Sequence, residues 1–166
     1  VINLYSYVVN PFTSSAYFDY DLFNSHVRCM TKMMDNMIDL ELEKINTIIE
    51  KIKSDLEDDE TKAIELNLWN KIARSCKLGR RAGIGITAEG DMLAALGYKY
   101  GTSTASAFAQ NIQKILALNV YIESCDLTQI DERPQFGCFD YSLEKNNPFL
   151  NRLADTSDLY NIEHTL

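Results

Sequence analysis

The sequence is poor in features that several classes of protein require. No apolar run approaches the roughly 20 residues that cross a bilayer, and no charged start followed by an apolar stretch marks a secretory leader. Basic residues number 16 against 24 acidic ones, so the chain lacks the clustered Lys and Arg of a nucleic-acid or anionic-membrane surface. We therefore expect a cytoplasmic protein that binds neither nucleic acid directly nor a membrane.

Cysteine and histidine are also scarce, which limits the metal and catalytic sites that the chain can form. No Cys-x-x-Cys pair or zinc-type Cys/His spacing occurs, so we expect no metal site. No Gly-x-Ser-x-Gly elbow occurs, and His26 is interpreted as an exposed or hydrogen-bonded residue of an amphipathic helix. The four cysteines, expected to be reduced thiols, are Cys29, Cys76, Cys125 and Cys138. Residue types and spacing alone therefore predict no catalytic residue.

The apolar content suits one folded unit. The chain has 166 residues, of which 46% are hydrophobic, and we interpret 1–166 as a single domain or part of one. It begins with Val1 rather than Met, and residues 1–9 form an apolar, β-branched run that is typical of a strand inside a sheet. We therefore expect an internal fragment of a longer chain.

Much of the remaining sequence has helical periodicity. A Met-rich apolar stripe runs from Phe23 to Met37, and a second stripe, one position out of phase, runs from Ile38 to Ile52. The shift in phase predicts a bend or a second helix near 35–39. We interpret the methionines as core packing rather than as a ligand site.

An acidic turn at 54–60 precedes the next helical pattern. The spacing predicts a helix from about Thr61 to Cys76. The residues expected to face inward are Ile64, Leu68 and Ile72, with Trp69 as a further candidate. Further helices are predicted over 91–96, from Ser103 or Thr104 to about Asp126, and within 155–166.

Residues 79–90 are the most distinctive stretch, with four glycines and two adjacent arginines. Ala88 replaces the third glycine of a dinucleotide fingerprint, and no Gly-Lys-Ser/Thr P-loop is present. The favoured interpretation is a short strand whose glycines permit close approach of another backbone. The alternative is an independent nucleotide-binding loop that uses Arg80 and Arg81.

The same stretch carries a resemblance to a known family. Residues 79–97, GRRAGIGITAEGDMLAALG, resemble the GRRTGLGITALGDMLAALG stretch of the ribonucleotide reductase large subunit. Asn3–Phe12 is similar to the region that follows the catalytic cysteine strand in that family, and Met34–Asp39 to its LDNVID helix. Phe139–Tyr141 with Asn147–Leu150 looks like the segment before its phosphate-binding loop. The similarity is closest to the adenosylcobalamin-dependent branch.

The resemblance implies a fold and a chemistry. The fold class would be mainly α, a helical fragment with one or two short strands from the ten-stranded α/β barrel of the reductase. In this family a thiyl radical abstracts the ribose 3′ hydrogen, a carboxylate deprotonates the 3′-OH, and two further cysteines reduce the 2′ carbon. The Asn-x-Cys-x-Glu motif is expected upstream of Val1 and the phosphate loop beyond Leu166, so no catalytic residue is assigned here and the isolated chain is expected to be inactive.

Partners and site residues follow from the same resemblance. The parent enzyme, expected to be a ribonucleoside-diphosphate reductase, would bind a ribonucleotide substrate and nucleotide effectors and would use adenosylcobalamin. This chain would bind no cofactor itself and would pack against the rest of the barrel. Exposed strand edges predict self-association. The residues expected to lie near the substrate, through backbone shape, are Gly83, Ile84, Gly85, Ile86 and Thr87.

The sequence departs from the family pattern in three places. Ala82 stands where Thr is usual, Glu89 stands where an apolar residue is usual, and residues 40–76 resemble a helical insertion. Insertions of this kind generally decorate a surface. The alternative function is a non-enzymatic helical module that binds a protein partner through the Met/Ile stripe and the acidic turn.

Overall fold

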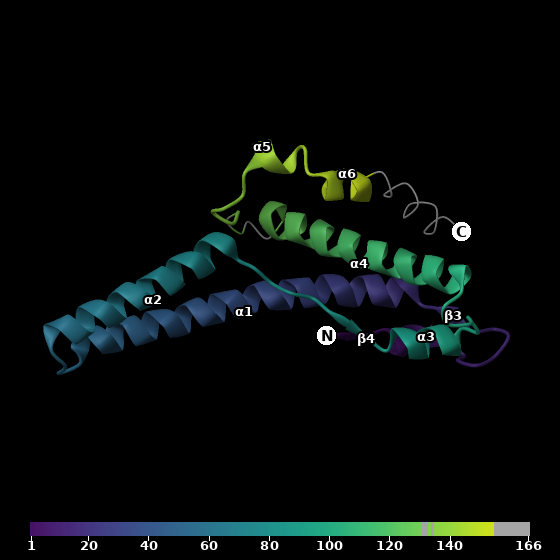
Figure 1. The fold of residues 1–166 in the computed structure, drawn as a ribbon, viewed down its shortest axis with the longest axis horizontal. Coiled ribbons are helices and arrows are strands. Elements are labelled where there is room, and N and C mark those ends of the chain that lie inside the picture. The colour runs from purple at the N-terminus through teal and green to yellow at the C-terminus, as the bar shows by residue number, and fades with distance from the viewer. Residues whose placement is uncertain (131–132, 134, 155–166) are drawn as a thin grey trace.

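The computed structural model describes residues 1–130, 133 and 135–154, and this part of the chain is mainly helical, as predicted (Figure 1). The helix predicted within 155–166 lies outside the described residues. The short strands are β1 (Ile2–Asn3), β2 (Val8–Val9), β3 (Tyr17–Phe18) and β4 (Ile86–Thr87), and a 3-10 helix, η1, spans Leu4–Tyr7. The helices are α1 (Tyr20–Ser54), α2 (Asp59–Gly79), α3 (Glu89–Ala95), α4 (Ser103–Gln129), α5 (Tyr141–Glu144) and α6 (Pro148–Ala154).

The apolar opening run forms β1, η1 and β2 in succession. β1 pairs in parallel with β4, with Ile2 opposite Ile86 and Asn3 opposite Thr87. β2 pairs antiparallel with β3. Because parallel strands need a crossover connection between them, α1 and α2 together form the connection from β1 to β4.

The prediction of a second helix near 35–39 is wrong, because α1 is one continuous helix of 35 residues. Asp19 caps it by accepting a hydrogen bond from the backbone N–H of Leu22 at 2.9 Å. The apolar stripe shifts because the two halves of α1 have different neighbours. The first half buries Phe23 and Val27 in the core beside α4, and the second half packs against α2.

The helix predicted from Thr61 is confirmed as α2, but two of the residues predicted to face inward are exposed instead. Ile64 and Leu68 are 66% and 55% exposed. Apolar residues occur on two sides of α2, so helical spacing alone fits either side. The partly buried side is the one that carries Leu66, Trp69, Ile72, Ala73 and Cys76.

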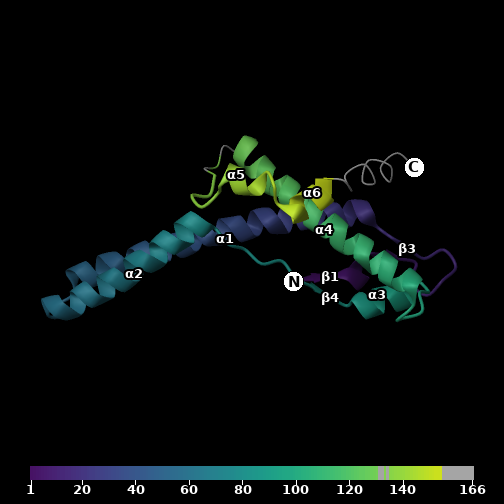
Figure 2. The same ribbon diagram turned by 45° about the horizontal axis from the view of Figure 1, so that its top comes forward.

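The core lies at one end of the molecule, between η1, α3, α4 and the first half of α1. Phe23 and Met92 are fully buried, and the Phe23 ring makes an edge contact with Tyr7 at 5.1 Å between centroids. Burial of a side chain such as Phe23 contributes about 2–3 kcal/mol. The second half of α1 and all of α2 extend away from this core as a helical hairpin (Figures 1 and 2).

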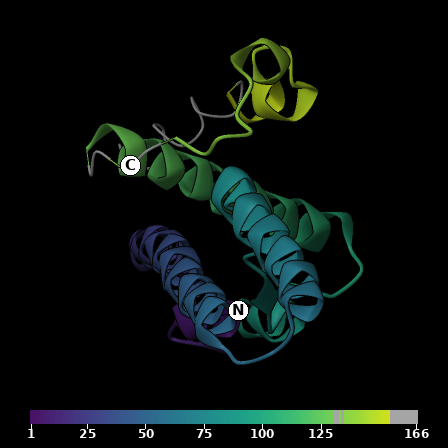
Figure 3. The ribbon, with the colours of Figure 1, turned by 90° about the vertical axis from the view of Figure 1, so that its left-hand side faces the viewer.

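Figure 3 shows α1 and α2 side by side, with α4 crossing near the end of α2. The hairpin contains residues 40–76, and α2 returns the chain toward the core at Gly79. Among the described residues, no helix has both the length and the apolar character needed to cross a membrane.

Candidate functional site

The segment that leaves α2 is held by ion pairs to the middle of α1. Arg80 ends α2 with a left-handed backbone (φ 39°), which turns the chain out of the helix. Its guanidinium donates from Nε to Oδ1 of Asp35 at 2.8 Å and from Nη1 to Oδ1 of Asp39 at 2.7 Å. The hydrogen bond that Arg80 donates to Asp39 lowers the pKa of Asp39 below its ordinary value, and the same bond raises the pKa of Arg80. Arg80 is therefore occupied by carboxylates of this chain.

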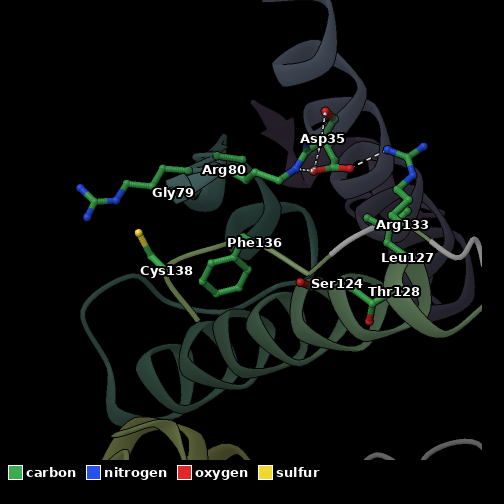
Figure 4. Close-up of a pocket in the computed structure, with 11 residues that line it drawn as sticks. Asp35, Gly79, Arg80, Ser124, Leu127, Thr128, Arg133, Phe136 and Cys138 are labelled. Atoms are coloured by element: carbon green, nitrogen blue, oxygen red, sulfur yellow. Dashed lines mark hydrogen bonds and ion pairs between the residues drawn. The ribbon is translucent and has the colours of Figure 1, made fainter. Parts of the chain in front are cut away.

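A second arginine, Arg133, also contacts Asp35 and completes a cluster of Asp35, Asp39, Arg80 and Arg133. Arg133 donates to Oδ2 of Asp35 at 2.5 Å and to the side-chain oxygen of Asn36 at 2.6 Å. Asp35 thus joins Arg80 and Arg133, which lie 45 and 98 positions away in the sequence (Figure 4). Sequence analysis did not find this cluster, because contacts between distant residues leave no local pattern.

A pocket of about 580 Å³ lies beside the cluster, between the end of α2, α4 and the turn at 136–138 (Figure 4). Ser124, Thr128 and Phe136 contribute hydroxyl groups and a ring to its wall. Arg81 also lines the pocket and is exposed. The pocket combines charged and apolar groups, and two of its three arginines, Arg80 and Arg133, already donate to Asp35.

The predicted site segment, Gly83–Thr87, continues from this pocket as an extended chain. Ile84 and Ile86 pack against the core, whereas Gly83, Gly85 and Thr87 are exposed. The carbonyl of Gly85 accepts a hydrogen bond from the backbone N–H of Ile2 at 2.8 Å. The predicted short strand is confirmed here as β4, and the exposed Gly83 and Gly85 lie in the extended chain just before it.

The glycines do not make room for another part of this chain. A Cβ built on Gly83 or Gly85 meets nothing within 4 Å, so the predicted close approach does not occur among the described residues. Both also lack the positive φ that favours glycine. Ala88 has the left-handed backbone instead (φ 60°), at the residue before α3. The side of the chain at Gly83 and Gly85 where a Cβ would point is therefore open.

The other candidate residues have structural contacts. His26 Nδ1 lies 3.2 Å from the hydroxyl of Tyr7, in keeping with a hydrogen-bonded helix histidine. All four cysteines are free thiols. In the ranges that the structure describes, no three His, Cys, Asp or Glu side chains gather as a metal site would require. The alternative of a nucleotide-binding loop would use Arg80, but the guanidinium of Arg80 is already paired with Asp35 and Asp39.

Comparison with known proteins adds one finding. The family described as "Ribonucleotide reductase, barrel domain" matches residues 1–154. The match covers the site segment, the hairpin and all the described helices. No curated protein and no solved structure gives a significant match.

Proposed function

Because the chain belongs to the ribonucleotide reductase barrel-domain family, we propose that it supplies two neighbouring barrel strands and their packing helices to a reductase. The family comprises oxidoreductases of deoxyribonucleotide biosynthesis. In our proposal the complete enzyme converts ribonucleotides to deoxyribonucleotides by thiyl-radical chemistry in the cytoplasm. The chain itself holds no Asn-x-Cys-x-Glu motif, so we expect it to be inactive alone.

The observation that carries this proposal is the parallel pair β1–β4. Each strand has two residues, and a crossover through α1 and α2 connects the two strands. Parallel strands occur almost only in larger sheets that are covered on both faces. A two-stranded parallel sheet with open edges is therefore understood best as part of a larger one, in keeping with a barrel.

Within that barrel, we propose that residues 83–87 lie near the ribonucleotide. The open space beside Gly83 and Gly85 lets a ligand or a neighbouring strand approach the backbone closely. Ile84 and Ile86 anchor the segment from the opposite side, since both pack against the core. The role of these residues is to set the shape of the site, without a proton or electron transfer by any of their side chains.

We also propose adenosylcobalamin as the radical source of the complete enzyme. We propose that this chain does not hold the cofactor. The cofactor would bind elsewhere in the reductase, where it generates the radical. Activity of the complete enzyme that depends on added adenosylcobalamin would support this assignment, and full activity without it would contradict it.

The experiment that tests the site is a substitution in the complete reductase that contains this chain. Gly85→Val fills the open space beside Gly85, one residue before β4. We expect kcat/KM to fall by about tenfold or more, because a substrate displaced from its productive position reacts more slowly. Gly90→Ala is the matched control, because Gly90 is also exposed with open space around it but lies in α3. Equal activity of the two variants would contradict the assignment.

The alternative function, a protein-interaction module, has one observation in its favour. Met33, Met37 and Leu40 on α1 are more than half exposed, as are Ile64 and Leu68 on α2. We propose that the segment 40–76 is a surface insertion that makes such a contact in the reductase. Deletion of 40–76 that leaves reductase activity intact would agree with this, and loss of activity with retained folding would give the segment a catalytic role.

A further inference from the structure

Two cysteines that are far apart in the sequence lie on one pocket. Cys76 is in the last turn of α2, and Cys138 is in the turn that follows α4. Both line a pocket of about 650 Å³ beside Ile38 and Leu78. Nothing in the spacing of the sequence brings these thiols together, since 62 positions separate them.

The backbone around Cys138 lies directly on the end of α2. The N–H of Cys138 donates to the carbonyl of Leu78 at 2.9 Å. Gly137 is close enough that a Cβ there would lie 2.5 Å from Cδ2 and 3.6 Å from Cα of Leu78. Cys138 is therefore hydrogen-bonded to the residue two positions after Cys76 in α2.

The other two cysteines are placed differently. Cys29 lines a separate pocket beside β1, with Val1 and Met33. Cys125 is exposed on α4. Cys76 and Cys138 are thus the two thiols that line the same pocket.

We propose that Cys76 and Cys138 are a reversible dithiol–disulfide pair that links the end of α2 to the turn before α5. A disulfide requires the two Cα atoms to lie within about 4.4–6.8 Å. Residues 135–140 are all exposed, so the turn can move toward Cys76 without repacking the core. The pair lies next to Arg80, where the chain leaves α2 for the site segment, and the inference does not depend on the proposed function.

The oxidant is a low-molecular-weight disulfide, such as glutathione disulfide. The exposed Cys138 thiolate attacks one sulfur of the oxidant, which forms a mixed disulfide and releases one glutathione thiolate. The Cys76 thiolate then attacks the Cys138 sulfur and releases the second. Two protein thiols are oxidised, one oxidant molecule is reduced to two thiols, and each protein thiol loses its proton to solvent.

The surroundings of the two thiols assign these roles. Cys138 is exposed, so a soluble oxidant reaches it. Burial raises the pKa of Cys76, and the negative charge of Glu41 raises it further, which makes Cys76 the slower nucleophile toward solution. Cys76 reacts once the mixed disulfide has formed beside it.

The test compares the folded and the unfolded chain. The 166-residue chain is equilibrated with glutathione disulfide in buffer and in concentrated urea, then alkylated, digested and mapped by mass spectrometry without reduction. In urea the shortest loop closes most readily. Cys125 and Cys138 are 13 positions apart, against 62 for Cys76 and Cys138, so loop closure favours the 125–138 peptide by about tenfold.

In buffer we expect the order to reverse, with the 76–138 peptide in excess. The C29S/C125S variant should lose two thiols per chain to glutathione disulfide, and the C29S/C76S/C125S variant should stop at the mixed disulfide on Cys138. Two results overturn the proposal. One is a 125–138 peptide that dominates in both conditions, and the other is a C29S/C125S chain, folded by circular dichroism, in which Cys138 is glutathionylated while Cys76 stays reduced.

Discussion

Nε of Arg80 donates to Oδ1 of Asp35 at 2.8 Å, and this contact joins the C-terminal end of α2 to the middle of α1. The other carboxylate oxygen of Asp35 accepts from Arg133. Asp35 is therefore the centre of a cluster that ties three separate parts of the chain together. It also sets the point from which the chain runs toward Gly83–Thr87.

Asp35→Asn should destabilise the fold by about 2–3 kcal/mol, because it leaves two mostly buried guanidinium groups without their shared charge. The side chains of Asp35, Arg80 and Arg133 are only 18%, 15% and 24% exposed. Asp39→Asn is the matched control: its side chain is 50% exposed, and the loss should stay below about 1 kcal/mol. Urea unfolding followed by circular dichroism measures both, and equal losses would show that Asp35 has no central role.

The same cluster predicts how stability depends on pH. The hydrogen bond from Arg80 lowers the pKa of Asp39 in the folded chain. The stability that this pair adds is therefore present above the ordinary carboxyl pKa and is lost as the pH falls through the lowered value. The difference in unfolding free energy between wild type and Asp39→Asn should shrink between about pH 6 and about pH 3. A difference that stays constant over this range would rule out the linkage.

The glycines of the site segment should be dispensable for folding. Gly85→Ala should leave stability unchanged or raise it by up to about 1 kcal/mol, since the new Cβ meets nothing and φ is not positive. Gly97→Ala is the contrasting variant, because Gly97 has φ +81° after α3, and we expect a loss of about 1 kcal/mol. Thermal unfolding of the two variants measures the difference. A large loss from Gly85→Ala would mean that the glycine serves the fold and not a neighbouring group.

Local patterns predicted α2, α3 and α4 because each has its own signals, whereas the short helices α5 and α6 were not predicted. Asp58 caps α2 by accepting from the N–H of Thr61 at 2.9 Å, and Thr102 caps α4. The alternative of a second helix within α1 was wrong because a shift of the apolar stripe looks the same whether the helix breaks or its neighbours change. Ile64 and Leu68 were placed on the wrong side of α2 because both sides carry apolar residues.

The candidate site was predictable only in part. The strand at Ile86–Thr87 follows from alternation and glycine spacing. The contacts of Asp35 with Arg80 and Arg133, and the shared pocket of Cys76 and Cys138, depend on how the hairpin folds back onto α4. Periodicity reports which side of an element is apolar, and it does not report which distant element covers that side.

The exposed apolar side of α2 should cause self-association of the isolated chain. Ile64 and Leu68 lie one helical turn apart and are more than half exposed, and apolar side chains in water associate. Replacement of both by Gln keeps the charge and the helix propensity, so the variant should remain folded. Its sedimentation coefficient should stay at the monomer value as concentration rises, whereas that of the wild type should increase. Asn67→Gln, on an exposed polar position of the same helix, should associate as wild type does. A wild-type chain that stays monodisperse and monomeric in light scattering would contradict this prediction, and so would a double variant that associates equally well.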